Sequence, residues 1–260
     1  MKTPTRVKPI LAWPGGKRCM LDKLLPRITA HKAYVEPFCG ALAVFCAKPP
    51  SALEVINDTH RELVSLYLCV KFHWPELDRE FDFLLNSRAE FNDFIAQPGL
   101  TEIQRAARWL VRRKNCFADA ETYFGRSKVS GGAAASSLLN KRATVEALHR
   151  RMDRTIIEHR SWQQCVEEYD APSTFFFFDP PYIKGAVNTY AMWKPAQMQE
   201  LRDRLATVQA NWMLTTCDSA ESRAIFKGLA METVVRAKGI NNKPGQPTGK
   251  TYGELIISPK

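Results

Sequence analysis

The sequence FFFFDPPY, residues 175–182, decides the fold. Four consecutive aromatic residues cannot alternate between a buried and an exposed face, so both faces of this segment need cover, as in a central strand of a parallel sheet. Neither Pro180 nor Pro181 can donate a backbone hydrogen bond, and the strand must therefore end before them. The Asp179 carboxylate then lies at the carboxyl end of a buried strand, where open α/β sheets bind ligands.

The same residues suit the chemistry of an amino group on a nucleobase. Such an amine is a poor nucleophile because its lone pair is delocalised into the ring. The Asp179 carboxylate and the Pro180 carbonyl can both accept hydrogen bonds from it, which localises the lone pair. Tyr182 offers a flat face on which a flipped base can stack. The alternative is a buried strand that ends in an ordinary proline turn, with Asp179 as a capping residue.

Asp-Pro-Pro-Tyr after an apolar strand resembles the catalytic motif of amino-group DNA methyltransferases. With the N-terminal segments below, the chain is similar to the Dam-type DNA adenine methyltransferases, well at both ends and poorly in the middle. The resemblance implies a Rossmann-like, S-adenosylmethionine-dependent methyltransferase sheet of the α/β class with an inserted helical target-recognition region. It also implies the reaction: transfer of a methyl group from S-adenosylmethionine to the 6-amino group of a flipped adenine in DNA.

The N-terminal sequence WPGGK, residues 13–17, has glycines that let the backbone approach a ligand closely. It is not a P-loop, because the first glycine of that motif and the Ser or Thr after the lysine are absent. A plain loop-to-helix turn is the alternative. In the resembled family a Trp-x-Gly-Gly-Lys segment helps to bind S-adenosylmethionine, which implies cofactor contacts for Trp13, Gly16 and Lys17.

Residues 33–40 predict a first strand and a glycine turn, the place where doubly wound folds hold a cofactor. The resemblance makes this the Phe-x-Gly-x-Gly motif. The residues that it assigns to the cofactor are Glu36, Pro37, Phe38 and Gly40. Leu42 stands where the motif has its second glycine, so its side chain is expected either to crowd the cofactor or to line the pocket.

A second strand is predicted over residues 53–58, ending in Asp58. A doubly wound fold uses a carboxylate about 20 residues after the glycine turn to hold ribose hydroxyls. The alternative role for Asp58 is the N-cap of the next helix. The family pattern Asn-Asp-x-x-x-Glu-Leu matches Asn57, Asp58, Glu62 and Leu63, which favours the ribose role.

The middle of the chain has helical spacings and clustered basic residues, which predicts a surface that contacts DNA phosphates. We therefore expect a discontinuous catalytic domain over 1–65 and 155–260, with a DNA target-recognition insertion over 66–154. Two terminal strands, 232–236 and 254–258, flank a basic hairpin tip. The candidate contacts to double-stranded DNA are Arg112, Arg113, Arg126, Lys128, Tyr190, Lys243 and Lys250.

Composition bounds the remaining possibilities. The 260 residues are 45% hydrophobic, enough for one large domain or one domain with an insertion, and the formal charge of +10 suggests a polyanionic partner. Seven cysteines without Cys-x-x-Cys spacing indicate neither a zinc site nor a disulfide framework. We therefore expect no metal, a reducing cytoplasmic location on DNA in a prokaryotic or phage-type setting, and, because no apolar run is long enough, no membrane span.

Two other functions stay open from the residues alone. Cytosine amino-group methyltransferases look similar but more often carry serine where Asp179 stands. A non-catalytic DNA-binding protein with a degenerate cofactor site is the second alternative, and Leu42 is the feature that supports it. The recognition sequence and the oligomeric state do not follow from the sequence.

Overall fold

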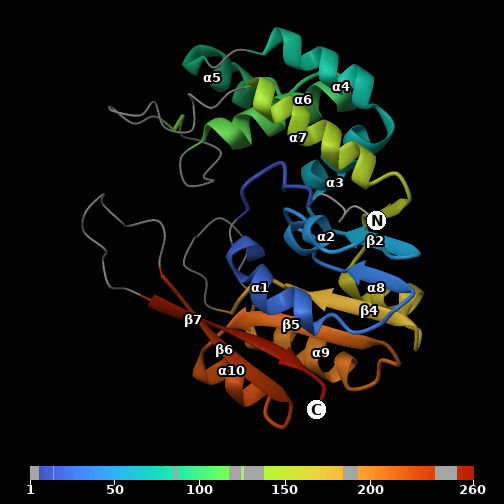
Figure 1. Ribbon diagram of the computed structural model, residues 1–260. Coiled ribbons are helices and arrows are strands. Elements are labelled where there is room, and N and C mark those ends of the chain that lie inside the picture. The colour runs from blue at the N-terminus through green and yellow to red at the C-terminus, as the bar shows by residue number, and fades with distance from the viewer. Residues whose placement is uncertain are drawn as a thin grey trace.

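A seven-stranded sheet in the order β3-β2-β1-β4-β5-β7-β6 forms the centre of the protein (Figure 1). The computed structural model describes residues 6–13, 15–84, 87–116, 124–125, 138–183, 193–237 and 251–260. Its strands are β1 (Ala33–Glu36), β2 (Leu53–Asn57), β3 (Thr155–Glu158), β4 (Thr174–Phe178), β5 (Asn211–Cys217), β6 (Ala230–Ala237) and β7 (Thr251–Ser258). The mixed α/β sheet confirms the predicted fold class and the predicted strands.

Neighbouring strands from β3 to β5 are parallel, whereas β7 is antiparallel to both β5 and β6. From β1 the chain builds outward to β2 and β3 on one side, and then to β4 and β5 on the other. The strand order therefore reverses between β1 and β4. Ligands of doubly wound sheets bind at such a switch point, beyond the carboxyl ends of the strands.

The aromatic run of β4 explains why this strand is central. Phe175 and Phe177 belong to the hydrophobic core on one face of the sheet, and Phe176 and Phe178 belong to the core on the other. All four are at most 3% exposed. Side chains alternate along a strand, so a run of four aromatics is satisfied only with cover on both faces.

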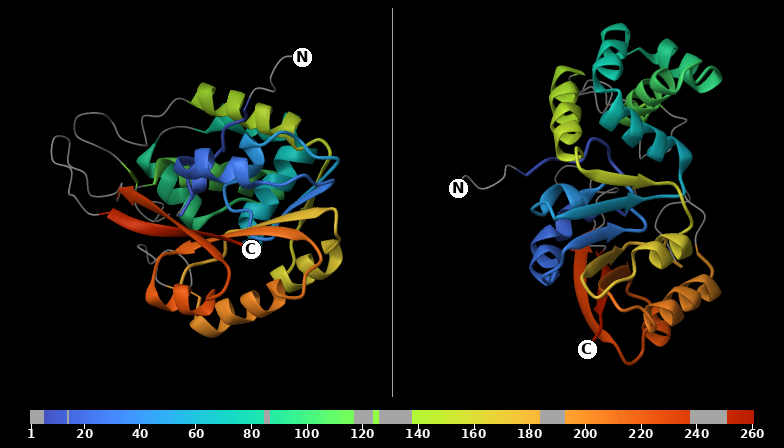
Figure 2. Two further views of the ribbon diagram at one scale, coloured as in Figure 1. Left: turned by 60° about the horizontal axis from the view of Figure 1, so that its bottom comes forward. Right: turned by 90° about the vertical axis from the view of Figure 1, so that its right-hand side faces the viewer.

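Helices supply that cover. On one face lie α8 (Trp162–Tyr169), α9 (Pro195–Leu205) and α10 (Ala220–Ile225). Buried side chains of α8 and α9 belong to the same core as Phe176 and Phe178, and the partly buried Ile225 of α10 packs against it. The other face is covered from the N-terminal part of the chain, and this layering is visible in Figures 1 and 2. The helices there are η1 (Lys17–Met20), α1 (Leu21–Leu24), η2 (Leu25–Arg27), α2 (Ala43–Ala47) and α3 (Arg61–Phe72).

Between β2 and β3 the described chain is helical and forms the upper part of the molecule in Figure 1. After α3 come α4 (Trp74–Glu80), η3 (Phe81–Phe83), α5 (Arg88–Ala96), α6 (Glu102–Asn115) and α7 (Leu138–Arg151). The predicted domain boundary between residues 65 and 66 falls inside α3, which runs without a break and packs against α6 and α7. The division into two domains stays a proposal.

A buried ionic cluster fixes the end of this helical part to the sheet. Arg151, the last residue of α7, donates to the Glu54 carboxylate of β2, and its guanidinium carbon lies 3.9 Å from the Phe45 ring centre. Lys48 Nζ donates to the same carboxylate at 2.6 Å. These two cations lower the pKa of Glu54 against the effect of burial, so the carboxylate stays ionised.

Candidate active site

The predicted site residues Glu36, Asp58 and Asp179 lie at or just beyond the carboxyl ends of β1, β2 and β4, on one edge of the sheet. This edge is on the left of Figure 1. Because β7 runs antiparallel to β5, its first half reaches the same edge, where Glu254 pairs with Cys217 of β5. Residues from both ends of the chain therefore meet at the switch point.

Asp179 is held by groups from two other segments. The ammonium of Lys17 lies 2.7 Å from Oδ1, and the hydroxyl of Thr215 on β5 donates to the same oxygen at 2.8 Å. Lys17 is only 2% exposed, whereas the side chain of Asp179 is 21% exposed. Burial raises the pKa of Asp179 and the charge of Lys17 opposes that rise. Lys17, predicted as a cofactor residue, is therefore an immediate neighbour of the predicted catalytic carboxylate.

Glu254 is a site residue that sequence reasoning missed. It is 1% exposed, and its Oε2 lies 3.8 Å from the Lys17 ammonium and 3.3 Å from the Tyr182 hydroxyl. The signal that could have found it is an acidic residue at the start of the apolar strand ELIIS, residues 254–258, because a buried carboxylate needs a partner. Lys17 thus lies between two carboxylates, Asp179 and Glu254.

Tyr182 joins the same cluster through its hydroxyl, which lies 3.4 Å from Asp179 Oδ1. The Lys17 ammonium lies 5.1 Å from the centre of the Tyr182 ring. Burial and then the neighbouring carboxylates Asp179 and Glu254 raise the pKa of Tyr182, so the phenol remains a neutral donor. The Pro-Pro turn is therefore followed by a tyrosine whose hydroxyl is held by the carboxylates of Asp179 and Glu254. The predicted role of Tyr182 in base stacking stays a proposal.

Asp58 braces the glycine turn after β1. Its Oδ2 accepts from the backbone N–H of Gly40 at 3.0 Å, and its Oδ1 accepts from the N–H of His60 at 2.9 Å. The N-cap of α3 is His60 and not Asp58, because the His60 ring nitrogen accepts from the N–H of Leu63 at 3.3 Å. The capping alternative for Asp58 is therefore wrong, and burial raises its pKa.

Glu36 and Pro37 are buried where β1 ends. One oxygen of Glu36 accepts from the Tyr34 hydroxyl and from the Phe45 N–H, each at 2.8 Å. Burial raises the pKa of Glu36 to about 8 despite these donors, so its carboxyl is mostly protonated at neutral pH. The Pro37 carbonyl accepts from the side chain of Asn57 at 2.9 Å, which ties the end of β1 to the end of β2.

The structure explains the leucine in the glycine motif. Leu42 has a φ of 62° and a ψ of 34°, the left-handed conformation that a glycine adopts freely. It is the only residue other than glycine with a positive φ in the part of the chain that the structure covers. Its side chain is 0% exposed and packs in the core with Phe45 and Tyr67. A side chain in that core does not crowd a pocket at the edge of the sheet.

The remaining predicted cofactor residues near this edge are Trp13, Gly16 and Phe38, and each makes a packing or backbone contact within the protein. The N–H of Gly16 donates to the Trp13 carbonyl at 3.0 Å, which closes the loop before Lys17. A Cβ on Gly40 would lie 2.9 Å from the Trp13 ring, so this glycine is required by a protein side chain. The Phe38 ring packs edge-on against Trp193, at 5.4 Å between ring centres, and Trp193 therefore serves packing on that side.

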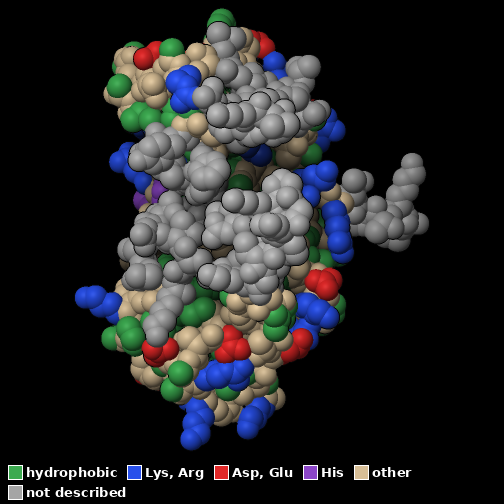
Figure 3. All heavy atoms as spheres, turned by 90° about the vertical axis from the view of Figure 1, so that its left-hand side faces the viewer, with side chains coloured by type: hydrophobic (Ala, Val, Ile, Leu, Met, Phe, Trp, Pro, Cys, Tyr) green, Lys and Arg blue, Asp and Glu red, His purple; other side chains and the backbone are tan. Residues whose placement is uncertain are grey.

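The expected DNA contact of Arg113 is wrong. The side chain is 3% exposed and lies beneath Trp13, with its guanidinium carbon 4.8 Å from the ring centre. Arg112 is half-buried and donates to the carbonyl of Phe94 at 3.3 Å, and its contact with DNA stays a proposal. The other candidates lie outside the described residues: Arg126, Lys128, Tyr190, Lys243 and Lys250. On the face shown in Figure 3, Lys and Arg side chains occur at both the helical end and the sheet end.

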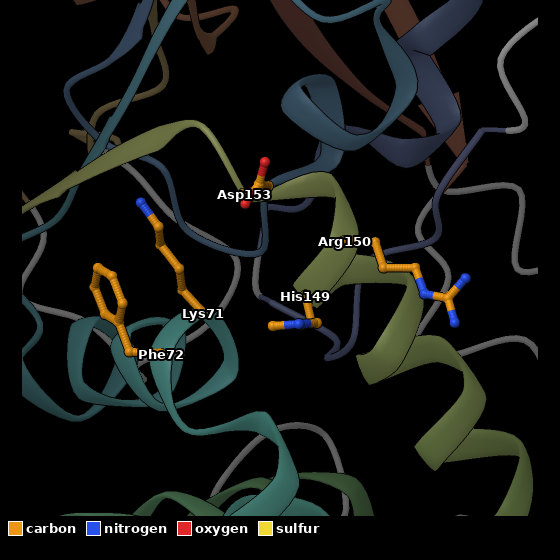
Figure 4. A pocket seen from close by; sticks show the side chains of 5 residues that line it. All are labelled: Lys71, Phe72, His149, Arg150 and Asp153. Carbon is orange, nitrogen blue, oxygen red and sulfur yellow. The ribbon is translucent and has the colours of Figure 1, made fainter.

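A pocket of about 370 Å³ lies elsewhere, between the ends of α3 and α7 (Figure 4). It is lined by Lys71, Phe72, His149, Arg150 and Asp153. Asp153 comes just before β3 begins, so the pocket lies near the amino edge of the sheet, opposite the site. Among the residues described, no group of His, Cys, Asp or Glu could hold a metal ion. No helix in the described ranges has the length and apolar character to cross a membrane.

The strand order and its switch point define a doubly wound, Rossmann-like α/β sheet. Residues 13–237 match the model of the D12 class N6 adenine-specific DNA methyltransferases. The chain therefore belongs to this family of enzymes, and its reaction is the methylation of adenine in DNA. Membership of the family also implies use of S-adenosylmethionine.

Individual relatives agree with this assignment. The type II methyltransferase M.CviBI of Paramecium bursaria Chlorella virus NC1A is 27% identical over 68% of this chain and 69% of its own. M.MjaIII of Methanocaldococcus jannaschii, another type II methyltransferase, is 26% identical over 97% of this chain and 99% of its own. The DNA adenine methylase of Salmonella typhi is 22% identical over 95% of this chain and 93% of its own.

Proposed function

We propose that Asp179 and the Pro180 carbonyl hold the adenine amine during methylation of double-stranded DNA. The main support for this proposal is that the two oxygens of the Asp179 carboxylate have different surroundings. Lys17, Thr215 and Tyr182 all contact Oδ1, at 2.7, 2.8 and 3.4 Å. Within the described part of the chain, no hydrogen bond or ion pair reaches Oδ2. One oxygen is thus fixed by the protein, and the other is left to accept from a substrate amine.

The reactivity of the amine follows from these acceptors. Two hydrogen bonds, one to Asp179 and one to the Pro180 carbonyl, draw the nitrogen toward tetrahedral geometry and localise its lone pair. Asp179 is also the first acceptor for the proton that the nitrogen must lose after methylation. Burial raises the pKa of Asp179, which makes it a better base than an ordinary aspartate, while Lys17 favours the ionised form at rest. Tyr182 supplies the face against which the flipped base stacks.

The edge of the sheet suits a cationic cofactor. Asp58, Asp179 and Glu254 place three carboxylates there, with Lys17 as a buried ammonium beside Asp179 and Glu254, while the mostly protonated Glu36 adds a neutral carboxyl. When bound, S-adenosylmethionine supplies a methyl group on a positively charged sulfonium, an activated leaving group. Asp58 would hold the ribose hydroxyls. The remaining proposed contacts come from Trp13, Gly16, Lys17, Glu36, Pro37, Phe38 and Gly40.

The alternatives that the sequence left open lose their support. The cytosine alternative conflicts with the adenine-specific family to which the chain belongs. The non-catalytic alternative depended on Leu42, whose side chain is buried in the core and whose backbone has the conformation of the glycine it replaces. For DNA, the net charge of +10 supports attraction of the polyanionic duplex.

The substitution Asp179→Asn tests the proposal. The amide oxygen can still accept from Lys17 and Thr215, so the amide NH₂ faces the adenine amine, and two donors then oppose each other. The rate of methylation of duplex DNA, measured with a labelled methyl group on the cofactor, should fall about 10²–10³-fold, the scale of losing one preorganised hydrogen-bonding group. DNA affinity in a gel-shift titration should remain.

A matched cofactor variant tests the pocket separately. Asp58→Ala should weaken binding of S-adenosylmethionine in calorimetric titration. The Asp179→Asn protein should remain folded. Full activity of Asp179→Asn would refute the catalytic assignment. Undiminished cofactor binding in Asp58→Ala would refute the ribose assignment and leave the assignment of Asp179 intact.

A further inference from the structure

Arg113 connects the helical part of the protein to the loop that carries Lys17. Its guanidinium Nη2 donates to the carbonyl of Ala12 at 3.2 Å, and the guanidinium carbon lies 4.8 Å from the Trp13 ring centre and 5.7 Å from that of Trp109. The side chain is 3% exposed. A charged group from α6 is therefore buried against the backbone and the ring of the N-terminal loop.

Besides Trp109 of α6, at 6.4 Å between ring centres, Trp13 has neighbours that belong to the cofactor edge. Its ring would collide with any Cβ on Gly40, at 2.9 Å. It packs edge-on against the His60 imidazole, with 5.6 Å between ring centres, and the His60 N–H donates to Asp58 at 2.9 Å. Trp13 thus contacts the glycine turn and the residue that anchors Asp58, and Arg113 lies beneath it.

We infer that Arg113 is a positioning residue that holds the loop of residues 12–17 in the shape needed for the cofactor, and thereby couples the helical insertion to cofactor binding. The inference rests on the proposed cofactor site. A guanidinium suits this position because its planar group can stack on an indole and donate a hydrogen bond at the same time, which a lysine ammonium cannot do equally well. A movement of α6 on DNA binding would be transmitted to Trp13 through these contacts.

The coupling between the two ligands is necessarily reciprocal. If DNA bound by the insertion changes the affinity for the cofactor, then the cofactor changes the affinity for DNA by the same factor. Loss of the guanidinium should therefore affect cofactor affinity and the coupling factor. Affinity for DNA in the absence of cofactor should stay nearly the same, because the Arg113 side chain is buried against the N-terminal loop.

The test uses S-adenosylhomocysteine, which lacks the methyl group and allows no turnover. Its affinity is measured by calorimetry for the full-length wild type, Arg113→Met, Arg113→Lys and Arg108→Met, each alone and with saturating random-sequence duplex. Arg108 is the matched control: it also lies on α6, donates to the Gln97 carbonyl at 3.0 Å and has its guanidinium carbon 5.2 Å from the Phe94 ring centre. These contacts stay within the insertion.

We expect Arg113→Met to bind S-adenosylhomocysteine about 10-fold more weakly and to lose the effect of duplex, a size within the range of allosteric couplings. Arg113→Lys should be intermediate, and Arg108→Met should bind the compound like the wild type. Affinity for duplex without cofactor should change less than about threefold in Arg113→Met. Thermal unfolding shows whether each variant is folded. If Arg113→Met does not fold, the affinity of the milder variant Arg113→Lys for S-adenosylhomocysteine decides the result.

Two results would overturn the inference. Unchanged binding of S-adenosylhomocysteine in Arg113→Met, with weaker DNA binding and a shallower dependence on salt, would make Arg113 a phosphate contact instead. No binding by the wild type, with or without duplex, would refute the proposed cofactor site and this inference with it. The second result is recognisable because it appears in the wild type and needs no variant.

Discussion

The left-handed leucine in the glycine motif gives the sharpest test of the local structure. Leu42 combines a φ of 62° with a side chain that is 0% exposed. A left-handed conformation costs an L-residue about 1–2 kcal/mol relative to glycine. Truncation of a buried leucine to alanine costs about 2–5 kcal/mol through lost burial and the cavity left behind. Strain and packing therefore act in opposite directions when this residue becomes glycine.

Leu66 on α3 is a matched control, because it is also 0% exposed and belongs to the same core but has helical backbone. At Leu66, glycine should be less stable than alanine by about 1 kcal/mol from helix propensity, with a further cost for the lost methyl group. At Leu42 the same methyl is lost, but relief of the left-handed strain offsets it by about 1–2 kcal/mol. The difference between glycine and alanine should therefore be about 2–3 kcal/mol smaller at position 42 than at 66.

The assay is urea unfolding of four variants, Leu42→Ala, Leu42→Gly, Leu66→Ala and Leu66→Gly, with thermal unfolding as a second measure. A difference of about 2–3 kcal/mol corresponds to roughly 4–12 °C in Tm for a chain of this size. Equal differences between glycine and alanine at the two positions would refute the reasoning. Leu42→Gly should also bind S-adenosylmethionine within about threefold of the wild type, because the side chain lies in the core.

Three further predictions concern charged groups in the candidate site and in the fold. Glu254→Gln removes a negative charge that raises the pKa of Asp179, so the acid limb of kcat/KM against pH should move to lower pH, and a move to higher pH would contradict the assignment. The folded protein raises the pKa of Glu36 from 4.5 to about 8, so the stability that Glu36 contributes is complete below pH 4.5 and is lost as the pH rises to about 8. Urea unfolding measured across this pH range should show the loss of stability in the wild type and not in Glu36→Gln. Arg151→Met leaves a buried carboxylate without one of its cations and should cost about 3–5 kcal/mol in urea unfolding, whereas Arg150→Met, in an exposed pair, should cost less than about 1 kcal/mol.

The strands were predictable because each carries a local signal. The aromatic run of β4 demanded cover on both faces, and the acid after β2 marked a strand end at the ligand edge. These signals depend on side-chain periodicity, which the sequence displays directly. The meeting of Glu36, Asp58 and Asp179 at one edge followed from the parallel order, because the carboxyl ends of parallel strands lie together.

Contacts between distant segments could not be predicted in the same way. Arg113 has the sequence neighbourhood of a phosphate-binding arginine, and only the packing of α6 on the N-terminal loop shows it buried under Trp13. Leu42 looks like a departure from a glycine motif until its backbone is seen to be left-handed. In both cases tertiary packing overrides a local pattern, since the cost of burial or strain is offset by partners far along the chain.

Strand β7 contributes to the candidate site although it lies beyond the matched part of the chain. The family match ends at residue 237, and β7 begins at Thr251. Yet Glu254 on β7 lies 3.8 Å from the Lys17 ammonium, which in turn lies 2.7 Å from Asp179. An ammonium between two carboxylates is shared by them, so a change in Glu254 alters how strongly Lys17 holds Asp179 ionised. The charge state of Asp179, the proposed catalytic carboxylate, is therefore set by three segments at once: the N-terminal loop, the central strand and β7.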